Sequence, residues 1–396
     1  LLTTSLTIGS GGSGGVFVVN TGALTIGDIS AMVGVSATGG DISVTATSPL
    51  TVHEDVVGAE DITLTAGETA AANDFLTVVT GVTVQTTGGD ITLQAGDGIR
   101  LQAADPAVPA PATRSTVSAS GTVTLNVGTA VADPDGSSSE LAGTIATTAH
   151  IQVNGGAGDD VLAIREAAVL PDALGLKFEG NGGNDGMNVF FASAHPHQNL
   201  IFEGGDGDDS LRIEGTEVAD AYCVKDALHT VQWAKTAATA DMAWFLVVKA
   251  YTAVENLAIH TKAGADSVTF GCAAAASGLK TMTVDGGGDN VLDGLKIVGT
   301  QTTHVPAAGE DAAADKYDPK DPKFPANFFD DTIMVDGVAS GVVYGTIPSF
   351  GVSNISRLQV LAAMGTTGSS TTPAWRPSWS ATPGGTSWSA APAMTS

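Results

Sequence analysis

The chain has 396 residues, of which 50 are glycine and only 5% are aromatic, so a folded core must be built from small and branched side chains. It carries 42 acidic residues against 16 Lys and Arg, which gives a formal net charge of −26. This balance argues against nucleic acid, which needs a basic surface, and against an anionic membrane surface. It fits a highly soluble protein, a cation-binding protein, or both. No run of about 18 apolar residues is present, so we expect no membrane span.

The beginning of the chain and its cysteines bear on its origin. Leu1 is not followed by a basic-then-apolar leader, so we expect a mature product or a piece of a longer chain. Cys223 and Cys272 are too few for a disulfide framework. They are either two separate small core residues or a pair brought together by coils of uneven length. Acidic, Thr/Gly-rich composition with few cysteines is typical of a secreted bacterial protein.

Residues 1–148 repeat a short phrase in which a turn is followed by alternating apolar and hydroxyl residues. The copies begin about 20 to 30 residues apart, as internal repeats of a solenoid do. Strict alternation predicts half-buried strands, which stacked copies can bury together. The phrases are GGDISVTA (39–46), AEDITLTAG (59–67), GGDITLQAG (88–96) and SGTVTLNVG (120–128).

In residues 149–364 the phrase changes to a Gly/Asp-rich turn between apolar strands, recurring about every 25 residues. The clearest copies are NGGAGDDVLAI (154–164), GNGGNDGMNVF (180–190) and EGGDGDDSLRI (203–213). Looser copies are KAGADSVTF (262–270), DGGGDNVLDG (285–294) and FDDTIMVDG (329–337).

Three further segments lack this pattern. Residues 219–231 and 235–251 contain enough alanine for a short helix, although the second run fits a strand equally well. Residues 304–327 are polar and contain several prolines, which predicts a surface loop. Residues 365–396 are Gly/Ser/Thr/Pro-rich without a period, which is typical of a linker or tail.

One strand and one turn in every repeat predict an all-β fold. We expect a right-handed parallel β-helix, or β-solenoid, with Gly/Asp turns, because successive coils make parallel strands and parallel connections favour right-handed winding. Residues 1–148 would form the part with GGDIT-type repeats and residues 149–364 the part with acidic turns.

The acidic turns have the chemistry of a calcium site. Glycines allow backbone conformations that direct carbonyl oxygens toward one point, aspartates add charged oxygens, and Ca²⁺ takes six to eight such ligands. Residues 155–163 and 204–212 fit the nonapeptide G-G-x-G-x-D-x-U-x, in which U is a large apolar residue. They resemble the RTX-type calcium repeat of bacterial secreted proteins.

The candidate ligands are nine residues in these turns: Asp159, Asp160, Asp185, Asp206, Asp208, Asp209, Asp266, Asp289 and Asn290. The family's nonapeptides run in tandem, whereas here one copy occurs per coil, and the copies around Asp185, Asp266 and Asp289 are degenerate. The alternative for every one of these residues is a turn-forming role through local hydrogen bonds. For Asp41, Asp61 and Asp90 in the N-terminal phrase, we favour that alternative.

The order of GGDITLQAGDGIRL, SGTVTLNVG, NGGAGDDVLAI and EGGDGDDSLRIEGT resembles the long β-strand-repeat surface proteins of bacteria, which share traits with filamentous-haemagglutinin-like and RTX-like adhesins. The resemblance covers about residues 37–362. It implies an extracellular, calcium-binding structural or adhesive protein that binds a cell-surface or polysaccharide ligand and has no catalytic residues. A filament or surface-layer subunit, associating end to end or side by side, is the alternative within structural proteins.

Other constellations carry weaker chemistry. His195 and His197 flank Pro196, where they lie in an exposed loop or form half of a metal site without an evident third ligand. A β-helix enzyme acting on polysaccharides would need carboxylates gathered with Arg or Lys, for example Asp97 with Arg100. The chain shows no ordered catalytic set, so we do not expect an enzyme.

Overall fold

The structure, a computed structural model, describes residues 4–6, 8–10, 14–27, 34–69, 73–104, 114–128, 136–191, 197–225, 229–235, 244–271, 278–287, 294–298, 334–335, 342–343, 349–353 and 357–361. These residues form strands and turns without a helix. They divide into two compact units, one of Leu1–Gly215 with Phe245–Asn256 and one of Thr216–Trp244 with Leu257–Ser396.

Three parallel sheets make up the first unit. The first sheet contains β1 (Thr4–Leu6), β4 (Leu24–Ile26), β7 (Leu50–Val52), β10 (Phe75–Val78), β13 (Gly98–Leu101), β16 (Ser138–Leu141), β19 (Val161–Ile164), β21 (Gly186–Phe190) and β23 (Ser210–Glu214). The second contains β2 (Ile8–Ser10), β5 (Val35–Ala37), β8 (Val56–Gly58), β11 (Thr83–Thr86), β14 (Thr116–Ser118) and β17 (Thr144–Ala146). The third contains β3 (Val16–Asn20), β6 (Ile42–Ala46), β9 (Ile62–Ala66), β12 (Ile91–Ala95), β15 (Val123–Val127), β18 (Ile151–Asn154), β20 (Lys177–Gly182), β22 (Leu200–Asp206) and β26 (Phe245–Thr252).

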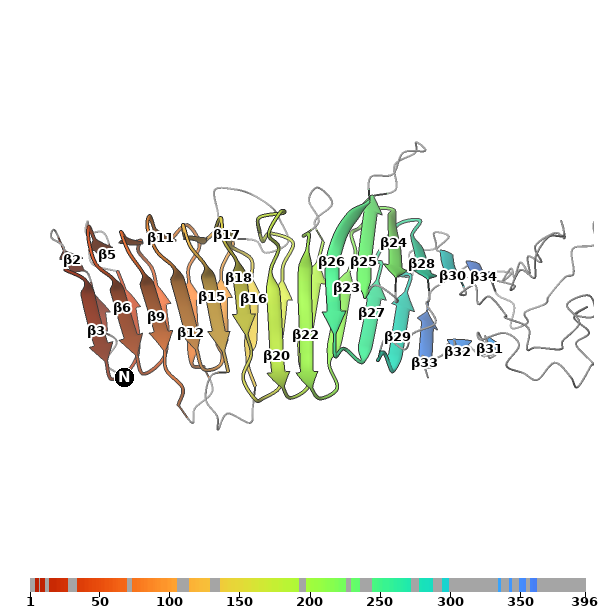
Figure 1. The fold of residues 1–396 in the computed structure, drawn as a ribbon, viewed down its shortest axis with the longest axis horizontal. Helices are drawn as coiled ribbons and strands as arrows, with labels where there is room; N and C mark the ends of the chain where they lie inside the picture. Colours follow the sequence, from red (N-terminus) through yellow and green to blue (C-terminus); the bar gives the residue numbers. More distant parts are fainter. Residues whose placement is uncertain are drawn as a thin grey trace, which may run out of the picture. The chain divides into compact units, whose positions relative to one another are not determined.

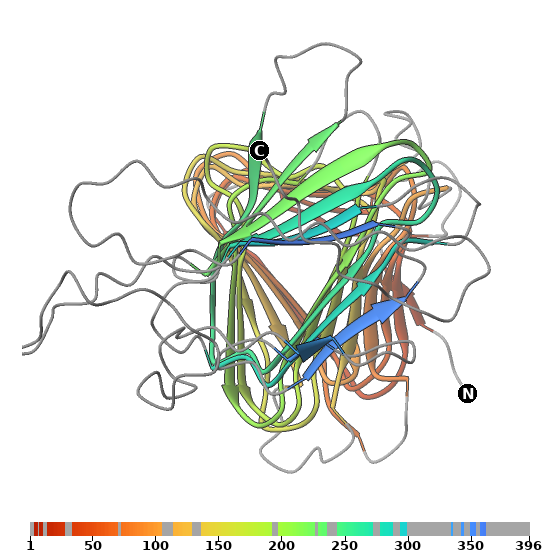
Figure 2. The same ribbon diagram turned by 90° about the vertical axis from the view of Figure 1, so that its right-hand side faces the viewer.

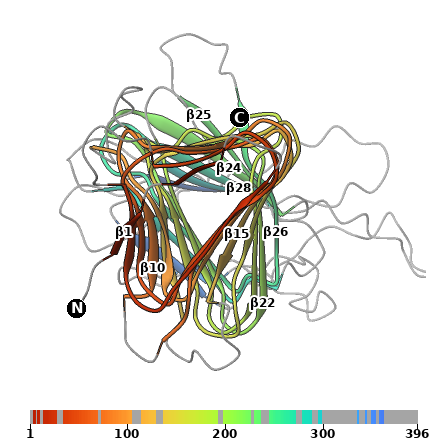
Figure 3. The ribbon, with the colours of Figure 1, turned by 90° about the vertical axis from the view of Figure 1, so that its left-hand side faces the viewer.

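The chain visits these sheets in turn and returns to the first, so each circuit is one coil of a parallel β-solenoid. Figure 1 shows the successive coils side by side, and Figure 3 shows the three sheets as three sides of a coil. Among the described residues from β19 onward, the second side has no strand, and an isolated bridge from Thr144 to Val169 continues it. The expected all-β parallel solenoid is therefore confirmed.

Alternation in the sequence becomes alternation between the interior and the surface. In β6, β9, β12 and β15 the apolar residues are buried and the Ser, Thr, Gln and Asn residues between them are half-buried on the outer side. The register stacks like on like, pairing Ile42 with Ile62 and Leu64 with Leu93. Further along the same sheet Phe178 stacks on Phe202, with ring centroids 5.2 Å apart. These columns are the core that holds neighbouring coils together.

The second unit contains two groups of neighbouring sheet strands and a separate pair. One sheet is β27 (Asn256–His260), β29 (Thr281–Asp285) and β33 (Ser349–Ser353), and the other is β25 (Thr230–Lys235), β24 (Asp220–Lys225), β28 (Ser267–Gly271), β30 (Gly294–Val298) and β34 (Arg357–Leu361). Strands β33 and β34 are blue in Figure 2. β24 and β25 form an antiparallel hairpin, whereas β28, β30 and β34 add in parallel. The separate antiparallel pair is β31 (Met334–Val335) with β32 (Val342–Val343).

The Ala-rich segments are strands rather than helices in the part of the chain that is described. Residues 220–225 and 230–235 form the β24–β25 hairpin, and residues 245–252 form β26. Tyr222, Trp233 and Val248 are buried at their strand positions, so the apolar residues of these runs serve a sheet core. The expected loop at 304–327 and the tail at 365–396 lie outside the described residues.

Candidate metal-binding corner

Three predicted ligands lie in one column at the corner where the chain turns from the third sheet into the first. Asp160, Asp185 and Asp209 each precede a strand of the first sheet directly, and the register places Val161 beside Gly186 and Gly186 beside Ser210. All three aspartates are at most 1% exposed. The expected alignment of these corners along one edge is therefore present in successive coils.

One carboxylate oxygen of each aspartate accepts a backbone hydrogen bond from the preceding coil. Ser137 N–H donates to Asp160 Oδ1 at 2.9 Å, Asp160 N–H to Asp185 Oδ1 at 2.7 Å, and Asp185 N–H to Asp209 Oδ1 at 2.7 Å. Asp209 N–H donates to Glu255 Oε2 at 2.9 Å. Charge-assisted bonds of this kind connect the coils at a position where buried N–H groups need acceptors.

The second carboxylate oxygens have different surroundings. Asp160 Oδ2 accepts a hydrogen bond from Gly156 N–H at 2.5 Å. Asp185 Oδ2 is buried and has no hydrogen-bond partner among the described residues. A buried oxygen of this kind is costly unless a proton or a cation meets it.

A main-chain carbonyl oxygen approaches each of these second oxygens. A Cβ added to Gly180 would lie within 3.0 Å of both Asp185 Oδ2 and the carbonyl oxygen of Gly204 in the next coil. The same convergence occurs at Gly155, with Asp160 Oδ2 and the Gly180 carbonyl.

The same convergence of oxygens occurs a third time at Gly204, where an added Cβ would lie within 3.0 Å of both Asp209 Oδ2 and the Ala253 carbonyl oxygen. Glycine is required at these positions because any side chain would collide with the oxygens. Pairs of hard oxygens from adjacent coils are ligands of the type that Ca²⁺ prefers.

The electrostatics of the column are those of crowded buried acids. Burial is the largest cause that raises the pKa of Asp185, to about 7 in total; the hydrogen bond from Asp160 N–H opposes the shift, and the negative charges of Asp160, Asp209 and Asp159 add to it. A cation beside Asp185 would favour its charged form and cancel this penalty.

The other predicted ligands of these turns are exposed. Asp159 Oδ1 accepts from Asn184 N–H at 2.6 Å, and Asn184 Oδ1 accepts from Asp208 N–H at 2.9 Å, so these residues form a second ladder on the outside of the corner. Asp206 is exposed at the end of β22. Within the described ranges, no three His, Cys, Asp or Glu side chains gather closely enough to hold a metal ion. An ion at the corner would therefore depend on main-chain carbonyls for most of its protein ligands.

Asp266 occupies a similar corner in the second unit. It is 3% exposed, and its Oδ1 accepts from Asp220 N–H at 2.7 Å. Asp220 Oδ2 in turn accepts from the N–H and the hydroxyl of Thr216, each at 2.9 Å. Asp289 and Asn290 lie outside the described residues.

Sequence reasoning missed several acids with the same role. Glu255 receives the N–H of Asp209, Asp220 pairs with Asp266, and Asp97 Oδ2 accepts from Asp74 N–H at 2.6 Å. None of the missed acids lies in a complete Gly-rich nonapeptide. For Asp74 and Asp97 the available signal was an acidic residue directly before a strand, and for Asp220 it was an acidic residue at the first position of a strand.

Asp41, Asp61 and Asp90 lie at a different corner, before strands of the third sheet, and are exposed. Asp61 N–H donates to Asp41 Oδ1 at 3.2 Å and Asp90 N–H to Asp61 Oδ1 at 2.8 Å. Their carboxylates thus accept hydrogen bonds from residues of the next coil, 20 and 29 positions away, whereas the role favoured for them from the sequence was local hydrogen bonding within the turn.

The histidine and cysteine expectations have separate outcomes. His197 is 4% exposed and its Nε2 lies 3.0 Å from the Arg165 carbonyl oxygen, so the expected exposed loop is wrong at this residue. Burial lowers the pKa of His197 to about 4. Cys223 is half-buried in β24, while His195 and Cys272 lie outside the described residues.

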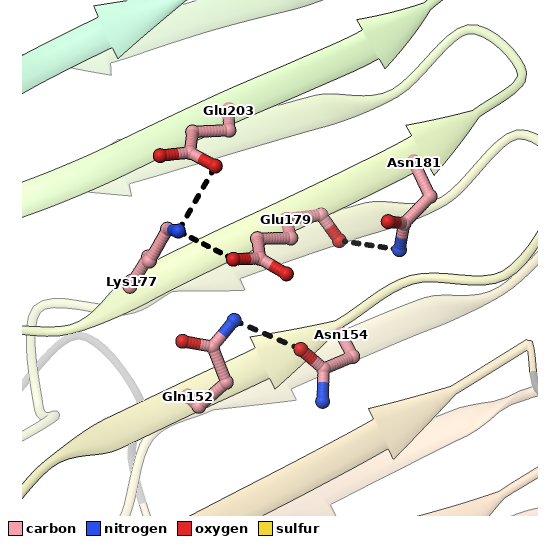
Figure 4. A network of polar contacts seen from close by, with 6 residues as sticks. All are labelled: Gln152, Asn154, Lys177, Glu179, Asn181 and Glu203. Atoms are coloured by element: carbon pink, nitrogen blue, oxygen red, sulfur yellow. Dashed lines mark hydrogen bonds and ion pairs between the residues drawn. The ribbon is translucent and has the colours of Figure 1, made fainter.

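The outer side of the third sheet carries a polar network that is independent of the corner (Figure 4). Lys177 Nζ lies 2.9 Å from Glu203 Oε2 and also contacts Glu179, and both glutamates raise the pKa of Lys177. Gln152 donates to Asn154 at 2.8 Å. The lysine separates two like charges on adjacent strands, which is a stabilising arrangement for the sheet.

The chain matches no protein-family model, and it matches neither a curated protein nor a solved structure. Among the described residues there is no helix with the length and apolar character needed to cross a membrane. The fold itself defines the class: a parallel β-solenoid with an acidic corner.

Proposed function

We propose that this chain is an extracellular, calcium-stabilised solenoid that serves as a structural or adhesive component of a bacterial surface. One observation carries the proposal: in three successive coils, a buried aspartate oxygen and a carbonyl oxygen of the next coil converge beside a glycine. The residues that would hold Ca²⁺ are Asp160, Asp185 and Asp209, with main-chain carbonyls and water completing the shell.

Calcium would supply positive charge at a place where the protein has gathered carboxylates away from water. The ion would neutralise the aspartates and connect adjacent coils, so that binding and folding are coupled. Extracellular calcium sites work at about 10⁻⁴ to 10⁻³ M, a range that such an incomplete protein shell fits.

Isothermal titration of the protein with CaCl₂ tests the proposal. We expect saturable binding by the wild type and its loss in an Asp160→Asn/Asp185→Asn/Asp209→Asn variant, in which each asparagine keeps an acceptor oxygen without the charge. The matched control is Asp41→Asn/Asp61→Asn/Asp90→Asn, which removes three charges from the exposed corner and should bind calcium normally. Equal loss of binding in both triple variants would assign the effect to overall charge and contradict the proposal.

A further inference from the structure

The outer side of the first sheet carries three of the chain's six arginines, although the chain is strongly acidic. Arg100 is on β13, Arg165 follows β19, and Arg212 is on β23; Arg100 and Arg212 are exposed. We call these residues, together with Phe75 and Phe190, the arginine stripe.

The stripe follows the coil register. Arg100 pairs with Glu140, Glu140 with Ala163, Ala163 with Asn188 and Asn188 with Arg212, so two members of the stripe, Arg100 and Arg212, lie in one column. The other three members lie outside this column. At about 4.8 Å per coil, the four steps place Arg100 and Arg212 about 19 Å apart along the sheet. The column is long enough for several sugar rings of an extended polysaccharide.

Aromatic rings and acids hold the guanidinium groups in place. The Arg100 guanidinium lies 3.5 Å from the centroid of the Phe75 ring, and that of Arg165 lies 4.7 Å from the Phe190 ring. Arg165 pairs with Glu140 at 2.6 Å.

Arg212 pairs with Glu214 at 2.5 Å. Among the described residues Arg100 makes no ion pair. Guanidinium groups fixed in this way lose little side-chain entropy when they bind a carboxylate.

We propose that the arginine stripe binds a carboxylated polysaccharide, a chain of uronic-acid sugars, lying along the first sheet. Guanidinium groups pair with carboxylates in a two-bond geometry, and the Phe75 and Phe190 rings support the guanidinium groups of Arg100 and Arg165. Charge complementarity centres on Arg100, which makes no ion pair among the described residues, whereas Arg165 and Arg212 each pair with one glutamate and Lys177 on the third sheet is shared by two. The inference rests on the proposed adhesive function and names its partner.

The test is calorimetric binding of a galacturonic-acid hexamer, with a neutral glucose hexamer as the comparison ligand. The variant is Arg100→Gln/Arg212→Gln. Its matched control is Lys177→Gln/Lys249→Gln, which removes two positive charges from the outer side of the third sheet. Each protein is measured with calcium and with a chelator, after circular dichroism has shown that it is folded.

We expect the wild type to bind the acidic hexamer and not the neutral one, with affinity that falls as salt rises. Arg100→Gln/Arg212→Gln should weaken binding about tenfold, which corresponds to two exposed charge contacts. The lysine control should stay within about twofold of wild type, well under the tenfold step of 1.4 kcal/mol.

Three results would contradict polysaccharide binding by the arginine stripe: no binding of the acidic hexamer by the wild type, equal binding of the neutral hexamer, or equal losses of affinity in both double variants. The calcium response of the unfolding temperature, measured on the same preparations, reports on the proposed function separately. Calcium could leave the unfolding temperature unchanged while only the arginine variant loses affinity for the acidic hexamer. That result would contradict the proposed calcium role and support polysaccharide binding by the arginine stripe.

Discussion

Asp185 shows, at the scale of a single residue, how a buried acid couples protonation to folding. Its folded-state pKa of about 7 lies above the ordinary value of 3.8. Folding therefore takes up a proton between these values, and the stability contributed by this group is full below about pH 4 and falls as the pH rises toward 7. Bound calcium would favour the charged carboxylate of Asp185, so that stability would rise rather than fall as the pH increases toward 7.

The first prediction concerns Asp185→Asn. Asparagine keeps the acceptor for Asp160 N–H and presents an amide N–H to the Gly204 carbonyl in place of a second acceptor. Without calcium at pH 8, we expect the variant to be more stable than the wild type in urea denaturation, and to respond less to calcium than the wild type, because Asp160 and Asp209 remain. Asp61→Asn, at the exposed corner, should change neither quantity. A variant less stable than the wild type at pH 8 without calcium would contradict this account of the buried oxygen.

The second prediction concerns His197, whose folded-state pKa of about 4 lies below the ordinary 6.5. The neutral ring is buried, so stability from this residue is full above pH 6.5 and is lost as the pH falls toward 4. A shift of this size corresponds to about 3 kcal/mol. In His197→Gln, the free energy of unfolding should fall less than in the wild type when the pH is lowered from 7 to 4. An unchanged pH profile in the variant would show that other groups cause the loss.

At the scale of the strand and its turn, glycine placement fixes how closely two coils approach. The third prediction compares two glycines of β20. Gly180→Ala brings a Cβ within 3.0 Å of Asp185 Oδ2 and the Gly204 carbonyl, whereas a Cβ at Gly182 meets only Ala157 Cα at 4.0 Å. We expect Gly180→Ala to lower the free energy of unfolding by about 1–3 kcal/mol and Gly182→Ala to have little effect. Equal effects of the two substitutions would indicate a general loss of glycine flexibility instead.

The strands were predictable because their burial follows a local rule. Ile62 and Leu64 alternate with threonines, and this period alone places them inside the coil. The alignment of Asp160, Asp185 and Asp209 was predictable for a related reason, since equal repeats place equal residues in one column. The hairpin at β24 and β25 was not, because alanine-rich sequence fits a helix or a strand and the sheet partner decides.

The missed corner acids depend on contacts that are distant in sequence. Glu255 reaches Asp209 across 46 residues, because the chain leaves for β24 and β25 before it returns in β26. No local period reveals such a return. Asp74 and Asp97 were missed because their turns lack the full glycine pattern, although they occupy the equivalent position before a strand.

At the scale of the whole molecule, the first unit is a stack in which each coil is stabilised mainly by its neighbours. Apolar columns on the inside and hydrogen bonds at the corners both run from coil to coil. In such a repeating structure, stability is a sum of coil and interface contributions. Neutralising one acidic column therefore acts on several interfaces at once.

The central claim is that calcium binds this acidic corner and stabilises the folded chain, and thermal unfolding followed by circular dichroism tests it most directly. With free calcium at 100 times its dissociation constant, we expect stabilisation of about 2.7 kcal/mol and a clear rise in the unfolding temperature, reversed by excess chelator. The Asp160→Asn/Asp185→Asn/Asp209→Asn variant should show no rise. The same unfolding temperature for the wild type in calcium and in chelator would contradict the claim.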